Sequence, residues 1–189
     1  MPLFLVKNMK KIKLAALLCF LGVKCASVAF ADEPKKVAFV DTGNTGRSVM
    51  AEAIADQYIG QHHQHIAVIS RAVDEDPYDV KPEENGVILM KRRGINTSAH
   101  RSAQLSANDV EHSDVILTMT EKHKEKVLAL YPQAAGKVFT LTEYATGQSS
   151  EIPDAWGKPL SFYEDVVATL DKLIPTALNK VVATEPSKQ

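Results

Sequence analysis

Short apolar runs alternate with longer amphipathic segments along most of the chain. The runs that read as buried strands are residues 37–40, 66–70, 115–118 and 137–141. The segments between them repeat apolar residues at helical spacing, which predicts helices over residues 50–58, 83–93, 121–130 and 161–182. Strands that alternate with helices favour a parallel sheet. The pattern therefore predicts an α/β fold, a four-stranded parallel sheet flanked by helices.

Several residues mark where these helices should begin and end. Gly60 is expected to end the first helix and Gly94 the second, because glycine readily adopts the conformation that closes a helix. Ser106, with Asp109 three residues later, predicts a capping box at the start of a further helix. Pro175 is expected to interrupt or restart the last helix, since proline lacks the backbone N–H that a helix uses.

The first residues have the composition of a secretory signal peptide. Lysines between Lys7 and Lys13 precede an apolar run over residues 14–23, and Ala29-Phe30-Ala31 supplies the small residues of a cleavage site. About ten apolar residues are too few to span a bilayer, which argues against a membrane anchor. We therefore expect residues 1–31 to be removed on export, with cleavage after Ala31. The prediction is a periplasmic or secreted protein with one domain over residues 32–189.

Cleavage would change both the charge and the cysteine content. The mature chain would have 189 − 31 = 158 residues, with 22 − 5 = 17 basic and 23 acidic side chains, a net charge of −6. An acidic domain is a poor candidate for binding nucleic acid or anionic lipid, so we expect neither partner. Cys19 and Cys25 both lie in the removed segment. The mature protein would therefore hold no disulfide and could not use thiolate chemistry.

A loop rich in glycine follows the first predicted strand and should bind an anion. Gly43 and Gly46 let the backbone turn with its N–H groups facing inward, and a helix begins near Ser48. Arg47 adds a planar fork of donors that can hold two phosphate oxygens. The predicted phosphate-binding residues are Thr42, Gly43, Asn44, Thr45, Gly46, Arg47 and Ser48.

This string resembles the phosphate loop of the low-molecular-weight protein tyrosine phosphatase family. The family pattern is a cysteine, five residues, an arginine and a serine or threonine, closely followed by a helix reading Met-Ala-Glu. The matching residues are Gly43, Asn44, Arg47, Ser48, Met50, Ala51 and Glu52. Asp41 stands where the family has its nucleophilic cysteine, and Gly46 and Val49 replace the usual cysteine and proline.

The resemblance covers nearly the whole mature chain and extends to a second half of the site. It is closest to the bacterial branch that includes the protein-arginine phosphatases, through the stretches HSDVILTMTEKHKE and GKVFTLTEYATG. Thr45 matches a threonine that accompanies phosphoarginine preference in that branch. Asp154 matches the family's general acid and Trp156 the aromatic residue at the substrate entrance, while Ala155 replaces the family's proline. The resemblance thus implies Asp41, Arg47 and Asp154 as catalytic residues.

The aspartate in place of cysteine leaves three hypotheses open. In the first, Asp41 attacks phosphorus and Asp154 protonates the leaving group of a phosphorylated small molecule or of a phosphorylated protein side chain, tyrosine or arginine. An oxidising compartment would make a thiol a liability, which gives a carboxylate nucleophile a rationale. In the second, the carboxylate mimics phosphate in its own loop, and the protein is an inactive pseudophosphatase that binds phosphate or an envelope protein. In the third, Asp41 only caps the helix, and the domain serves as an envelope interaction protein.

We expect no cofactor, no metal site and a monomer or weak dimer. Mg²⁺ assists other aspartyl phosphatases, but the sequence shows no complete acidic cluster that would hold it. His62, His63 and His65 form an HHQH stretch without a fourth ligand in view, which favours a solvated loop over a metal site.

Overall fold

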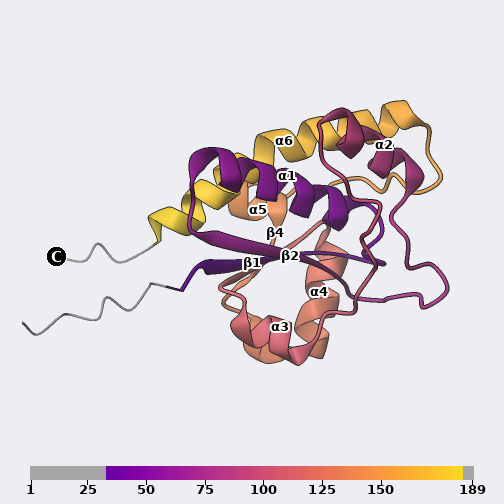
Figure 1. Cartoon of the computed structure of the whole chain (residues 1–189). Helices are drawn as coiled ribbons and strands as arrows, with labels where there is room; N and C mark the ends of the chain where they lie inside the picture. The colour runs from indigo at the N-terminus through magenta and orange to yellow at the C-terminus, as the bar shows by residue number, and fades with distance from the viewer. Residues whose placement is uncertain (1–32, 185–189) are drawn as a thin grey trace, which may run out of the picture. The chain divides into compact units, whose positions relative to one another are not determined.

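A parallel sheet forms the centre of the structure, a computed structural model that describes residues 33–184. Its strands are β1 (Lys35–Asp41), β2 (Ile66–Ala72), β3 (Val115–Thr118) and β4 (Val138–Thr140). They lie in the order β2-β1-β3-β4, and every neighbouring pair is parallel. The predicted four-stranded parallel sheet is confirmed, and β1 and β3 are its two interior strands (Figure 1).

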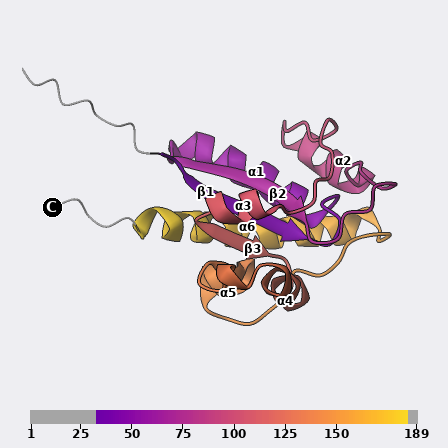
Figure 2. The same cartoon turned by 90° about the horizontal axis from the view of Figure 1, so that it is seen from below.

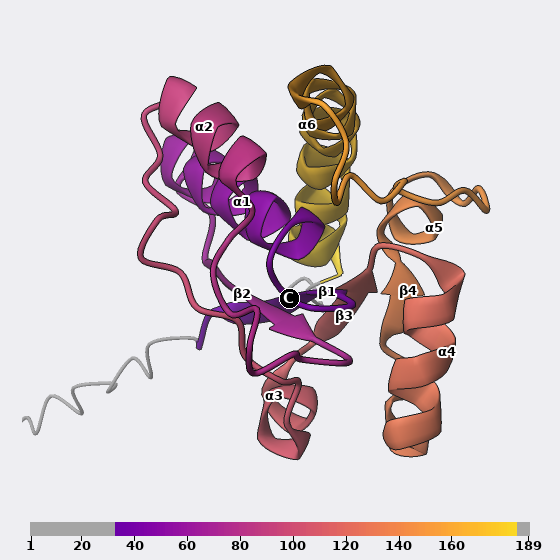
Figure 3. The same cartoon turned by 90° about the vertical axis from the view of Figure 1, so that its right-hand side faces the viewer.

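Helices connect the strands and flank the sheet. They are α1 (Arg47–His62), α2 (Glu84–Arg92), α3 (Ala107–His112), α4 (Glu121–Leu130), the short 3₁₀ helix η1 (Pro132–Ala134), α5 (Leu141–Thr146) and α6 (Leu160–Ala183). Figures 1 and 3 show α1, α2 and α6 on one face of the sheet and α3 and α4 on the other. From below, α1 lies on the side of β2, and α4 lies toward β3 (Figure 2).

Strand β1 supplies side chains to the core on both faces because successive residues of a strand point to opposite sides. Val37 and Phe39 join the cluster that contains the buried residues of α1 and α6. Ala38 and Val40 join the other cluster, with residues of α3 and α4. All four side chains are buried. Because β1 is covered on both faces, it holds its last residue, Asp41, at the carboxyl edge of the sheet.

The strand order also creates the crevice in which the site lies. From β1 the chain passes to β2 on one side and later to β3 on the other, so the connections leave the carboxyl ends in opposite directions. Such switch points are where ligands bind on open α/β sheets. The loop of residues 42–46 lies there, between the end of β1 and the start of α1.

The first helix is longer than the sequence predicts at both ends. It begins at Arg47 and runs through Gly60 to His62, so the expected stop at Gly60 is wrong. His63 closes the helix instead, in a left-handed conformation with φ 51°, and its N–H donates to the carbonyl oxygen of Ile59. A single exposed glycine costs a helix only about 1 kcal/mol, which the buried face of α1 offsets.

Helix α6 differs from the prediction in a similar way. It is one helix of 24 residues with Pro175 inside it, not two segments that meet at the proline. Ile174 and Leu178 on either side are fully buried, and this packing maintains the helix across the missing hydrogen bond. The structure also contains α5, which the sequence analysis did not predict; Thr140 and Glu143 form a capping box at its start.

The other predicted boundaries agree more closely. Strand β2 continues past Ser70 to Ala72, α2 is followed by Gly94 at φ 78°, and β4 is shorter than predicted because Leu141 already belongs to α5. The predicted capping box at Ser106 is confirmed, and β3 and α4 have the predicted bounds.

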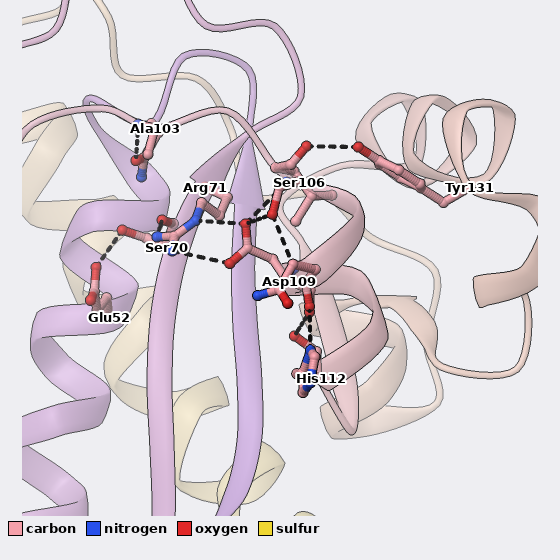
Figure 4. A network of polar contacts seen from close by, with 12 residues as sticks. Glu52, Ser70, Arg71, Ala103, Ser106, Asp109, His112 and Tyr131 are labelled. Atoms are coloured by element: carbon pink, nitrogen blue, oxygen red, sulfur yellow. Dashed lines mark hydrogen bonds and ion pairs between the residues drawn. The ribbon is translucent and has the colours of Figure 1, made fainter.

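A polar network fixes the segment that runs past the site into α3 (Figure 4). Arg71, near the end of β2, donates from Nε and Nη2 to the two carboxylate oxygens of Asp109, at 3.1 Å each. The same carboxylate accepts from the backbone N–H and the hydroxyl of Ser106, at 3.0 and 2.6 Å. Burial raises the pKa of Asp109, but the hydrogen bonds from Arg71 and Ser106 outweigh this effect and hold it below its ordinary value.

The expected signal peptide over residues 1–31 lies outside the described residues. The described residues fall in one compact unit that begins at Glu33. Within residues 33–184, no helix combines the length and the apolar character needed to cross a membrane.

Replacing Asp109 with asparagine should weaken the fold in a pH-dependent way. The variant loses the paired charge and part of the cap, and we expect its free energy of unfolding at pH 7 to fall by about 1–2 kcal/mol. Because the folded-state pKa lies below the ordinary value of about 3.9, the contribution is present above that value and is lost as the pH falls through the folded-state pKa. Urea unfolding from pH 7 to pH 3 measures it.

Asp165→Asn, an exposed substitution on α6 that also removes one negative charge, is the matched control. A constant difference between Asp109→Asn and the natural protein at every pH would contradict the assignment of this ion pair.

Candidate active site

Asn44 holds the loop in shape from within. It adopts φ 56°, a left-handed conformation that asparagine tolerates better than most residues, and it is fully buried. Its side chain donates to the Ser48 hydroxyl at 3.0 Å and accepts from the backbone N–H of Ala103 at 3.0 Å. The backbone carbonyl oxygen of Asn44 lies 3.0 Å from Nε2 of His100. The loop is therefore tied to α1 and to the segment before α3.

The anion inside this loop is the carboxylate of Asp41. One oxygen accepts from the backbone N–H of Asn44 at 2.7 Å and the other from the N–H of Ser48 at 2.9 Å. The side chain is 3 % exposed. Ser48 lies in the first turn of α1, so the carboxylate also interacts with the positive end of that helix. These are the contacts that the phosphate-mimic and helix-cap hypotheses describe.

Arg47 joins the loop to the segment that carries Asp154. Its guanidinium is buried; Nη1 donates to the carbonyl oxygen of Ile152 at 3.1 Å, and Nη2 lies 3.3 Å from a carboxylate oxygen of Asp154. The Asp154 side chain is 63 % exposed and accepts from the backbone N–H of Trp156 at 3.3 Å. Trp156 is exposed as well. The two parts of the site, about a hundred residues apart in sequence, are thus in direct contact.

A pocket of about 270 Å³ opens over these groups and is strongly acidic. The structure brings Asp41, Arg47, Asp154 and Trp156 together there with Thr42, Gly43 and Thr45, whereas Asn44 and Ser48 lie buried behind the loop and Gly46 lies against Glu83. Six carboxylate side chains line the pocket: Asp41, Asp74, Asp76, Asp79, Glu83 and Asp154. Among the described residues of this lining, Arg47 carries the positive charge.

His123 is a buried imidazole beside the loop that the sequence analysis did not single out. Its Nε2 lies 2.8 Å from the hydroxyl oxygen of Thr42, and the side chain is buried. Burial and the nearby charge of Arg47 lower the pKa of His123, partly opposed by the carboxylates of Asp41, Asp154 and Glu151. The imidazole is therefore neutral at pH 7 and holds Thr42 at the mouth of the loop.

Other residues of the site were also missed, and the sequence offered a signal for only some of them. His123 lies in the stretch HSDVILTMTEKHKE that carries the family resemblance, so its place beside the loop was open to inference; His100 lies in the segment before α3. Glu83 and Tyr163 lie in no such stretch. The hydroxyl of Tyr163 donates to the carboxyl group of Glu83, and no local sequence pattern predicts this contact between distant residues.

No group of three or more histidine, cysteine, aspartate or glutamate side chains within residues 33–184 is placed to hold a metal ion. In the HHQH stretch, His62 ends α1, and the ring Nδ1 lies 2.9 Å from the carbonyl oxygen of Tyr58; His63 and His65 follow as exposed residues.

Comparison with known proteins agrees with the fold and with the family resemblance. Residues 36–187 match the family model described as low molecular weight phosphotyrosine protein phosphatase. A protein-arginine-phosphatase of Geobacillus stearothermophilus is 31% identical over 150 residues, which cover 78% of this chain and 97% of that protein. A probable low molecular weight protein-tyrosine-phosphatase, EpsP of Ralstonia solanacearum, is 31% identical over 139 residues, 73% of this chain and 90% of its own.

A solved structure extends the likeness to the coordinates. A cysteine-to-serine mutant of YwlE arginine phosphatase, with a phosphorylated active-site serine, superposes with a TM-score of 0.75 at 29% sequence identity. The match covers 79% of this chain and 97% of that one. The family model matches residues 36–187, which is most of the chain. The chain therefore belongs to the low molecular weight phosphotyrosine protein phosphatase family.

Proposed function

We propose that this protein is a phosphatase that acts on phosphorylated protein side chains, with Asp41 as the attacking group. The observation that carries the proposal is the convergence of Asp41, Arg47 and Asp154 on one pocket, with Arg47 and Asp154 in contact at 3.3 Å. A phosphate-binding cation, a general acid and a group in the nucleophile position are the parts that phosphoryl transfer through a covalent intermediate requires. The relatives named above are protein phosphatases, which supports the same conclusion.

The proposed reaction proceeds in two steps. An oxygen of the Asp41 carboxylate attacks phosphorus while the bond from phosphorus to the leaving atom breaks, and Asp154 gives its proton to that atom. The product is an aspartyl phosphate. Water then attacks phosphorus and passes its proton to the Asp154 carboxylate, which releases inorganic phosphate and restores Asp41. Arg47 and the N–H groups of the loop hold the phosphoryl oxygens throughout.

An oxygen nucleophile in this type of loop has support from a relative. The YwlE mutant carries its phosphoryl group on an active-site serine. A serine phosphate is an ester of an aliphatic alcohol, which is a poor leaving group, and it hydrolyses slowly. An aspartyl phosphate is a mixed anhydride, and its carboxylate, with an ordinary pKa of about 3.9, leaves far more readily. Aspartate therefore combines an oxygen nucleophile with an intermediate that water can discharge.

The charge of the pocket favours a substrate that carries its own positive charge. Two like charges about 4 Å apart repel by roughly 4 kcal/mol at an effective dielectric constant near 20, so the acidic lining opposes a phosphate dianion alone. A phosphorylated guanidinium group presents N–H donors and partial positive charge to the same carboxylates. We therefore propose phosphoarginine as the substrate, in agreement with the named activity of the Geobacillus relative. Phosphotyrosine is the alternative.

Binding without turnover is a second candidate function, and the position of Asp41 favours it. The two carboxylate oxygens already accept the N–H groups of Asn44 in the loop and of Ser48 in α1, which a phosphate would otherwise use. Arg47 is likewise bonded to Ile152 and Asp154. A loop filled by its own carboxylate would bind free phosphate weakly and would serve a pseudophosphatase whose ligand is a protein.

We also propose that the protein acts outside the cytoplasm, in the periplasm or the medium, after removal of residues 1–31. The support is the lysine-rich start, the apolar run and the small residues Ala29 and Ala31. Absence of cysteine after Ala31 suits an oxidising compartment.

Substitution of Asp41 separates turnover from binding. If Asp41 attacks phosphorus, Asp41→Ala and Asp41→Asn abolish hydrolysis of phosphoarginine and para-nitrophenyl phosphate, because neither side chain forms an acyl phosphate. Phosphate release by the purified protein, at pH 4 to 8, measures this. If the natural protein is inert and Asp41→Cys gains turnover, the carboxylate silences a competent scaffold and the second candidate holds.

Substitution of Asp154 tests the general acid. Asp154→Asn keeps the shape of the side chain but has no carboxyl proton, so kcat/KM for phosphoarginine, which reports the transfer of phosphate to Asp41, should fall by about 10²–10⁴. The loss of kcat/KM should be smaller for para-nitrophenyl phosphate, because para-nitrophenolate leaves without a proton. Equal losses of kcat/KM on both substrates would show that Asp154 acts in the first step by holding Arg47 and not by giving a proton to the leaving group.

Expression of the whole chain in a Gram-negative host tests export. We expect the protein in the periplasmic fraction, with the mass of a chain that begins at Asp32. Ala31→Leu, which removes the small residue at the cleavage site, should leave residues 1–31 attached. Recovery of the uncleaved natural chain from the cytosol would contradict the proposal.

A further inference from the structure

Glu83 is tied to the phosphate loop although it lies 37 residues beyond it. It immediately precedes α2, and its backbone N–H donates to the carbonyl oxygen of Thr45 at 2.9 Å. One carboxyl oxygen accepts from the hydroxyl of Tyr163 on α6. The other lies 3.4 Å from the hydroxyl of Thr45, a long and weak hydrogen bond. That second oxygen therefore retains capacity to accept hydrogen bonds.

The glycine at position 46 is what admits this carboxyl group to the loop. A Cβ atom at Gly46 would lie 2.4 Å from Oε1 of Glu83 and 2.7 Å from its Cδ, well inside the closest approach of real atoms. Glu83 thus occupies the space that any side chain at position 46 would need. Position 46 is also one where this chain departs from the cysteine of the family pattern. The carboxyl group of Glu83 therefore fills space that a cysteine side chain at this position would need.

The carboxyl group of Glu83 lines the pocket, and within residues 33–184 it forms no ion pair with a basic side chain. It lines the acidic pocket together with Asp41, Arg47 and Asp154. Burial raises its pKa, the hydrogen bond from Tyr163 lowers it, and the negative charges of Asp41 and Asp154 raise it again. A positively charged group that enters the pocket would stabilise the ionised form of Glu83, which burial and the neighbouring carboxylates disfavour. In the proposed substrate, phosphoarginine, that group is the guanidinium to which the phosphate is attached.

We propose that Glu83 determines specificity by accepting hydrogen bonds from the N–H groups of a guanidinium leaving group. The inference rests on the proposed function and assigns to one residue the choice between a nitrogen-linked and an aryl-oxygen-linked phosphate. An aryl leaving group has no N–H donor to offer, so it gains nothing from Glu83 and meets its negative charge. A site built around a polar group discriminates strongly against substrates that cannot pair with it.

The test is the ratio of kcat/KM for phosphoarginine to kcat/KM for para-nitrophenyl phosphate. In Glu83→Gln, which keeps the volume but removes the charge, and in Glu83→Ala, we expect this ratio to fall about tenfold to a hundredfold. A structural role would lower both values of kcat/KM together and leave the ratio unchanged. An unchanged ratio in both variants would overturn the proposal.

Two further variants separate the carboxyl group from its surroundings. Tyr163→Phe removes a hydrogen bond to Glu83 but leaves the carboxylate in place, so the ratio should remain within about threefold of the natural value. Gly46→Ala should displace Glu83 and lower the ratio as Glu83→Ala does, and the double variant should be no worse than either single one. Additive losses in the double variant would contradict a shared mechanism.

Failure of the proposed function is distinguishable from failure of this assignment. If the natural protein hydrolyses neither substrate, phosphatase activity is overturned, and the Glu83 assignment is decided by calorimetry with phosphoarginine and phosphotyrosine. We then expect Glu83→Gln to weaken phosphoarginine binding about tenfold or more relative to phosphotyrosine. Equal affinity changes for the two ligands would overturn it.

Discussion

A buried carboxylate needs hydrogen-bond donors, and the loop that follows β1 is shaped around that need. Desolvating an ionised group costs several kcal/mol unless donors replace the water it loses. Asp41 receives two backbone N–H groups and the positive end of α1, while Asn44 keeps the loop in the conformation that points those groups inward. The strand, the loop and the helix therefore depend on one another through a single side chain.

This arrangement makes the protein's own carboxylate a competitor for any incoming anion. Because Asp41 is attached to the loop, its effective concentration there is high and does not change with dilution. A substrate must therefore supply binding energy away from the phosphate, and the acidic lining with Trp156 at its edge is the part of the site that can provide it. The electrostatics of the pocket and the occupied loop point to the same requirement, a ligand recognised mainly by the group that bears the phosphate.

The sequence predicts the parts of this protein whose causes are local. The apolar runs predicted the four strands, and Ser106 predicted the start of α3. The residues of the loop could be proposed because they are adjacent in the sequence. The length of α1 and the continuity of α6 were missed because burial outweighs the local preference of Gly60 and Pro175. Helix α5 was missed because Thr140 serves as the end of a strand and as a helix cap at once. The contact of Glu83 with Gly46 joins distant residues and leaves no periodic signal.

Trp156 has a practical consequence because it is the single tryptophan of the chain. Its indole lies on the rim of the acidic pocket, two residues beyond Asp154, and is 67 % exposed. The tryptophan emission of the intact protein therefore arises from this one place. The colour and intensity of that emission respond to the polarity and charge around the indole, so the natural chain carries an intrinsic spectroscopic reporter at the entrance to its site.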